Sequence, residues 1–187
     1  MIERGIASDR IGMTLKYLAV SGLAFQAVHF IEHVAQLGYW MARPLETPWL
    51  TPWAVAGRDQ LAVGGDAVLG NEILHLVGNL VFLAGLGALY LYRHRQTLAT
   101  SPALRVAMVI QGFHVAEHMA LTMTAAVWGK AVGISTFLGL VDGPIMTSYR
   151  VWFHLLVNLV ASWFAARAVM PLFDRGLPRS NVPGNAH

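Results

Sequence analysis

Four long apolar runs alternate with short polar segments along the chain. They cover about residues 15–41, 71–92, 103–127 and 147–170. Each is long enough for a helix to cross a bilayer, which takes about 20 residues. Proline, glycine and other turn-forming residues separate the runs. The pattern predicts an all-α integral membrane protein with a four-helix transmembrane bundle, preceded by a cytoplasmic segment over 1–16 and followed by a flexible tail over 176–187.

The first and third runs carry the same polar pattern. Residues 26–33 read Gln-Ala-Val-His-Phe-Ile-Glu-His, and residues 111–118 read Gln-Gly-Phe-His-Val-Ala-Glu-His. Positions three and four apart share one face of a helix, so each copy forms one polar stripe. The stripes are Gln26, His29, Glu32 and His33 in the first copy, and Gln111, His114, Glu117 and His118 in the second. Because polar side chains in a membrane helix are costly, the two stripes indicate function.

The second and fourth runs also match each other. Residues 75–79 read His-Leu-Val-Gly-Asn, and residues 154–158 read His-Leu-Leu-Val-Asn. The transmembrane domain, over 17–175, is therefore predicted to contain two helical hairpins, at about 17–93 and 103–170. Since both hairpins enter the membrane from the same side, a pseudo-twofold axis along the membrane normal would relate them, as in a parallel repeat.

The composition supports the membrane assignment and excludes several classes of site. Hydrophobic residues make up 56% of the chain and charged residues 12%, about half of the ~25% typical of soluble domains. The chain has no cysteine, which excludes disulfides, thiolate metal sites and iron–sulfur clusters. Its basic residues are scattered at the ends of the runs, so we expect no nucleic-acid binding. Their excess on one side predicts that both termini are cytoplasmic.

The segment between the first two runs is predicted to be a loop on the membrane surface. Its prolines disfavour a helix, and tryptophan is enriched at membrane interfaces. These residues are Pro44, Pro48 and Pro52, with Trp40, Trp49 and Trp53. A further proline, Pro171, is expected to end the fourth helix.

The histidines of the four runs are predicted to meet at one depth. The four runs contain six histidines. With a helical rise of about 1.5 Å per residue, all six fall within a slab of about 10–12 Å in the outer half of the bilayer. Histidine and glutamate from facing helices are a common metal-binding arrangement in bundles. The candidate ligands are His29, Glu32, His33, His75, His114, Glu117, His118 and His154. The glutamates could instead bridge two metals or orient a histidine, and the amides of Gln26, Asn79, Gln111 and Asn158 are expected to support the ligands.

These residues favour a membrane metalloprotein with one or two transition-metal ions. Iron or copper is favoured, and zinc also suits imidazole ligands. The expected chemistry is oxidation or reduction of a small or lipid-soluble substrate by a metal-dependent membrane oxidoreductase, and hydrolysis is the alternative reaction for two metals.

Other functions fit the same residues. They are a b-type haem with two axial histidines, a metal-transport protein, an accessory subunit of a larger membrane complex, a proton or ion pathway, and a purely structural network of hydrogen bonds. Besides the lipid bilayer, the candidate partners are a redox protein, a larger membrane complex and a second copy of the chain.

Overall fold

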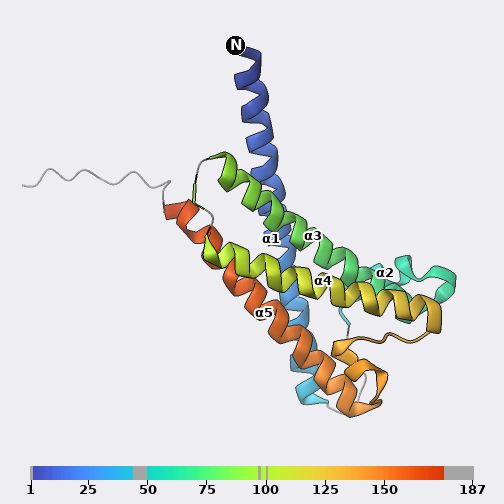
Figure 1. The fold of residues 1–187 in the computed structure, drawn as a ribbon. Coiled ribbons are helices and arrows are strands. Elements are labelled where there is room, and N and C mark those ends of the chain that lie inside the picture. The colour runs from blue at the N-terminus through green and yellow to red at the C-terminus, as the bar shows by residue number, and fades with distance from the viewer. Residues whose placement is uncertain (1, 44–49, 97, 100, 175–187) are drawn as a thin grey trace, which may run out of the picture.

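The computed structural model describes residues 2–43, 50–96, 98–99 and 101–174 (Figure 1). In chain order the elements are α1 (Ile2–Ala42), α2 (Pro52–Leu61), the 3-10 helix η1 (Val63–Gly65), α3 (Ala67–Arg95), α4 (Pro102–Trp128), the 3-10 helix η2 (Ile134–Gly139) and α5 (Pro144–Asp174). These ranges contain no strand, which confirms the all-α class. The predicted tail over 176–187 lies outside the described residues, as do Pro44, Pro48 and Trp49.

The four long helices pack in pairs around a common interior. Helix α1 contacts α3 and α5, and α4 contacts the same two helices. The short helix α2 packs on α3, and η2 packs on α5. Figure 1 shows α2 and η2 away from the N-terminus, while the start of α1 extends beyond its neighbours. The short elements therefore cover one end of the helices.

An apolar core fills the half of the structure nearer the N-terminus of α1. Phe82, Leu86 and Leu104 are fully buried there, surrounded by alanines of α4 and α5. Helices α1 and α3 touch directly at two glycines, since a Cβ atom on Gly22 would lie 2.7 Å from the Cα atom of Gly85. Small residues permit this close helix packing.

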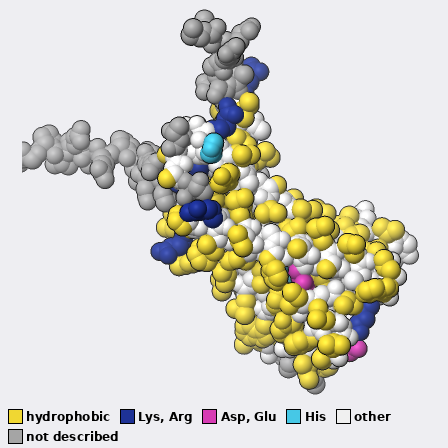
Figure 2. Space-filling model, viewed as in Figure 1, with side chains coloured by type: hydrophobic (Ala, Val, Ile, Leu, Met, Phe, Trp, Pro, Cys, Tyr) yellow, Lys and Arg dark blue, Asp and Glu magenta, His cyan; other side chains and the backbone are white. Residues whose placement is uncertain are grey.

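Three of the described helices are long and apolar enough to cross a membrane. They are Arg10–Ala42 within α1, Ala67–Arg95 (α3) and Pro144–Met170 within α5. Helix α4, predicted as a fourth, is not among them because Gln111, His114, Glu117 and His118 lower its hydropathy. These four polar residues are buried inside the structure. Figure 2 shows that hydrophobic side chains cover most of the visible face, with most charged side chains toward its ends.

Several helix boundaries differ from those expected. Helix α1 begins at Ile2 instead of near residue 15, because no proline interrupts the polar segment before the apolar run. Pro52, expected to break a helix, starts α2 directly after its N-cap, Thr51. Proline is favoured at that position, where its missing N–H is not needed. Helix α5 continues past Pro171 to Asp174, since proline removes only one backbone donor near the end of a helix.

Candidate metal centre

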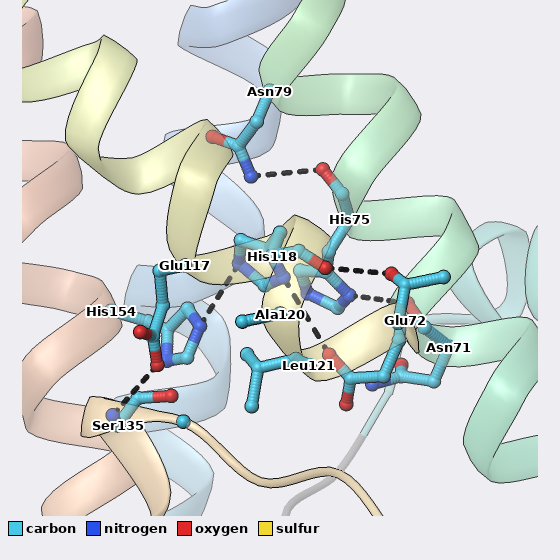
Figure 3. Close-up of polar contacts among 12 residues, drawn as sticks. Asn71, Glu72, His75, Asn79, Glu117, His118, Ala120, Leu121, Ser135 and His154 are labelled. Carbon is cyan, nitrogen blue, oxygen red and sulfur yellow. Dashed lines mark hydrogen bonds and ion pairs between the residues drawn. The ribbon is translucent and has the colours of Figure 1, made fainter. Parts of the chain in front are cut away.

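The structure brings the six histidines of the apolar runs together. Neighbouring ring centroids are between 4.6 and 6.2 Å apart. This histidine cluster consists of His29 and His33 from α1, His75 from α3, His114 and His118 from α4, and His154 from α5. Figure 3 shows His118 between His75 and His154. The side chains of four different helices therefore converge on one place.

Two pairs of histidines have their ring nitrogens at the spacing of metal ligands. The Nε2 atoms of His118 and His154 are 3.1 Å apart, and those of His29 and His33 are 3.2 Å apart. Two nitrogens bound to one ion at about 2.0–2.1 Å lie about 2.8–3.0 Å apart in octahedral geometry and about 3.3–3.4 Å apart in tetrahedral geometry, and both observed distances fall between these values. His114 joins the first pair, since the three residues place one nitrogen each within 4.8 Å of one another. These three could hold a metal ion.

Backbone carbonyls fix the orientation of two of the rings. The Nδ1 atom of His75 is 2.8 Å from the carbonyl oxygen of Asn71, and that of His154 is 2.9 Å from the carbonyl oxygen of Arg150. A carbonyl oxygen only accepts hydrogen bonds, so each Nδ1 carries the proton and donates. In the neutral ring each Nε2 then presents a lone pair, and outer hydrogen bonds of this kind orient metal-binding histidines.

Three buried polar atoms of the histidines and of Glu72 have no hydrogen-bond partner among the described residues. They are the Nδ1 atoms of His114 and His118 and the Oε2 atom of Glu72. A buried polar group without a partner costs about 1–3 kcal/mol, and more when charged. The last two atoms lie 3.5 Å apart, which places a carboxylate beside the ring of His118. A bound cation would make use of this buried negative charge.

Glu72 is the site residue that the sequence pattern did not single out. Its side chain is only 1% exposed, and its other carboxylate oxygen accepts a short charge-assisted hydrogen bond from the guanidinium of Arg150. Glu72 has no counterpart in the second hairpin, where Val151 stands three positions before His154. Glu72 could still have been recognised in the sequence, because it lies three residues before His75 and therefore on the same face of the helix.

Glu32 and Glu117, expected beside the histidines, are engaged elsewhere. Glu32 accepts hydrogen bonds from the backbone N–H and the hydroxyl of Thr51, at 3.1 and 2.5 Å. Glu117 accepts from the backbone N–H groups of Ile134 and Ser135, at 3.1 and 2.8 Å, and Figure 3 shows its carboxylate directed to Ser135. Buried N–H groups in the connecting segments need acceptors, and the two carboxylates supply them. Their assignment as metal ligands stays a prediction.

Replacing Glu117 with alanine is therefore expected to loosen the segment around η2 while leaving bound metal in place. Two backbone donors would lose a charged acceptor, a loss of about 1.5–3 kcal/mol for each hydrogen bond. We expect a lower melting temperature and faster proteolysis in this segment, with unchanged metal content by elemental analysis. Glu32→Ala should act in the same way at Thr51. Loss of metal from a variant that is still folded would show that the carboxylate is a ligand.

The four amides form two equivalent pairs between the hairpins. Gln26 Nε2 donates to Asn158 Oδ1 at 2.9 Å, and Gln111 Nε2 donates to Asn79 Oδ1 at 2.8 Å. Each asparagine also donates to the backbone carbonyl of the histidine four positions before it. The distance is 2.8 Å for Asn79 and 2.9 Å for Asn158. The amides thus join neighbouring helices and hold the backbone of two histidine positions.

A cavity of about 440 Å³ connects the histidine cluster with the end of the helices covered by α2. Its wall includes His33, His75 and His154, together with Arg58 of α2. The pair formed by Glu72 and Arg150 also lines it, together with the first residues of α3. The cavity therefore places three histidines of the cluster and the Glu72–Arg150 pair in one wall.

Comparison with known proteins identifies the family. One family model matches residues 3–177, nearly the whole chain. The chain belongs to the DUF6008 family. That family is described as one of unknown function, so membership assigns no activity. No curated protein and no solved structure matches the chain.

The two hairpins of this DUF6008 member contribute unequally to the site. In the second hairpin, His114, His118 and His154 are buried and share one potential metal position. In the first hairpin, the ring of His75 lies 5.8 and 5.9 Å from the rings of His29 and His33, and it stacks on His118 at 5.3 Å. The three histidines of the second hairpin are therefore the best-formed ligand set in the described residues.

Proposed function

We propose that the protein is an integral membrane metalloprotein, a metal-dependent oxidoreductase that acts on a small or lipid-soluble substrate. One or two transition-metal ions bind to the histidine cluster in the outer half of the bilayer, and both termini lie in the cytoplasm. The observation that carries the proposal is the buried set of His114, His118 and His154, whose ring nitrogens lie within 4.8 Å of one another. Buried polar groups need partners, and a metal ion would satisfy several at once.

The membrane part of the proposal requires α4 to span with the other three long helices. Its 27 residues give a length of about 40 Å, enough for the hydrocarbon layer. Its polar residues face the interior, as intramembrane ionisable residues usually do. The matching hydrogen bonds of the two Gln–Asn pairs support a bundle built from two parallel hairpin repeats.

The ligand set favours copper within the group of candidate metals. With Glu32 and Glu117 bonded to backbone groups, the donors that converge are imidazole nitrogens. Imidazole suits copper, zinc and iron, and copper(II) binds such sites most tightly among the divalent ions. Copper and iron would supply electron transfer at the site.

The surrounding residues have defined roles in this proposal. The carbonyl of Arg150 orients His154, while the Glu72 carboxylate lies beside the Nδ1 atom of His118, where it can accept a proton. The guanidinium of Arg150 holds that carboxylate in place. The cavity of about 440 Å³ admits water and substrate from the outer side.

Two features disfavour the ion pathway and the haem among the alternative functions. The fully buried side chains of Phe82, Leu86 and Leu104 fill the inner half of the structure. An apolar plug of this kind does not suit a route for ions across the membrane. The six imidazole rings also pack against one another at 4.6 to 6.2 Å, which leaves no slot for a porphyrin between axial ligands.

The experiment is metal analysis of the detergent-purified protein together with its absorption spectrum. We expect one or two copper or iron ions per chain and no Soret band. A Soret band would replace the proposal with the haem alternative. Zinc alone would exclude a redox role, and protein without bound metal after purification from metal-supplemented cells would refute the metal centre.

A further inference from the structure

A second and smaller cavity lies beside the histidines of the first hairpin. Its volume is about 150 Å³, and it is enclosed by α1, α2 and α3. Phe25, Val28 and Trp53 line it and are 42%, 56% and 62% exposed, so they also form part of the outer surface. His29 and His75 form its inner wall. In the proposed membrane orientation, the cavity therefore connects the hydrocarbon layer with the histidine cluster.

The second hairpin carries a larger side chain at one position that lines this cavity. Gly78 lines the cavity and lies three residues after His75. The corresponding residue of the second hairpin, three residues after His154, is Val157 in α5. A Cβ atom on Gly78 would approach the Phe25 ring to 3.3 Å, so the missing side chain keeps the space open. In agreement, His114 is completely buried, while its counterpart His29 is only partly buried.

Several polar groups in the wall already have protein partners. Glu32 accepts hydrogen bonds from Thr51, Gln36 is bonded to His33, and the Nδ1 atom of His75 donates to a backbone carbonyl. A buried water needs two to four polar partners, whereas an apolar cavity of about this size stays dry and accepts benzene or xenon. The cavity therefore suits a small apolar molecule.

We propose that this cavity is a lateral entry site through which dioxygen passes from the lipid hydrocarbon to the histidine cluster. Dioxygen is small, apolar and more soluble in hydrocarbon than in water. Phe25, Val28 and Trp53 form the entrance, Gly78 provides the space, and His29 and His75 mark the inner end. The delivery of dioxygen to a metal rests on the proposed function, whereas binding of an apolar gas in the cavity does not.

The test uses xenon as the probe and crystals of the full-length protein in detergent, pressurised with xenon gas. We expect a xenon peak between Phe25, Trp53 and Gly78 in the wild type, and loss of that peak in Gly78→Val, which installs the side chain found in the second hairpin. Gly87→Val is the matched control on the same helix, because a Cβ atom there meets nothing within 4 Å. It should retain the peak.

A second blocking variant keeps the test decisive if Gly78→Val does not fold. Ala54→Leu fills the cavity from α2, a separate helix, and should also remove the xenon peak. A wild-type crystal without xenon in the cavity, an equal peak in both blocking variants, or an ordered acyl chain in its place would overturn the entry site. The xenon result is independent of metal content, so a metal-free protein that still binds xenon would refute only the proposed function.

Discussion

Replacing His118 with alanine is expected to remove the bound metal. Its Nε2 atom is 3.1 Å from that of His154, its Nδ1 atom is 3.5 Å from Glu72, and its ring stacks on His75. No other histidine of the cluster makes all three kinds of contact. Since losing an outer partner of a ligand already weakens metal binding by about 10–100-fold, losing the ligand should cost more. Elemental analysis of the purified variant and titration with copper measure the effect.

Two controls separate loss of a ligand from loss of structure. His94→Ala changes an exposed histidine near the ring of Tyr90, far from the cluster in the chain, and should keep full metal content. His118→Gln keeps a polar side chain in the buried site, so its thermal unfolding distinguishes a cavity effect from a missing ligand. Full metal content in a folded His118→Ala protein would exclude His118 from the ligand set.

His33 holds the position in the first hairpin that His118 holds in the second, and replacing it tests how many ions are bound. If two ions bind, His33→Ala should lower the metal content from two to one per chain, because His29 and His33 would hold the second ion. With one ion bound by the second hairpin, His33→Ala should retain it.

The spacing of polar residues was sufficient to predict the convergence of the histidines. A polar side chain on an apolar membrane helix is costly to expose to lipid, so the polar face of the helix turns toward the protein interior. The repeat then placed His29 and His114 at equal depth, and in the structure both stripes meet the histidines of α3 and α5 in one cluster. The all-α class followed from the same apolar runs.

The carboxylates could not be assigned from this spacing. Glu32 and Glu117 share the face of the histidines, yet each is bonded to backbone N–H groups of a connecting segment. That choice depends on how the segments fold over the helix ends, which helical periodicity does not describe. Glu72 was missed for the opposite reason, because it interrupts the repeat that drew attention to the other residues.

Replacing Glu72 with glutamine is expected to weaken metal binding by about 10–100-fold, as for other carboxylates that support a metal-bound histidine. The amide has the same shape but carries no charge beside His118. The change also leaves the guanidinium of Arg150 without its anion. Breaking a buried pair from one side costs about 3–5 kcal/mol, and the value should lie near the lower end because the Arg150 side chain is 24% exposed.

A double variant separates the two consequences. In Glu72→Gln combined with Arg150→Gln, no charge remains unpaired, so much of the lost stability should return, because replacing both partners of a buried pair is far less costly than removing one. Metal affinity should stay low, because neither amide restores the negative charge beside His118. Thermal unfolding of the metal-free proteins measures the first effect, and copper titration measures the second. If the double variant regained metal affinity along with stability, Glu72 would act only as the partner of Arg150.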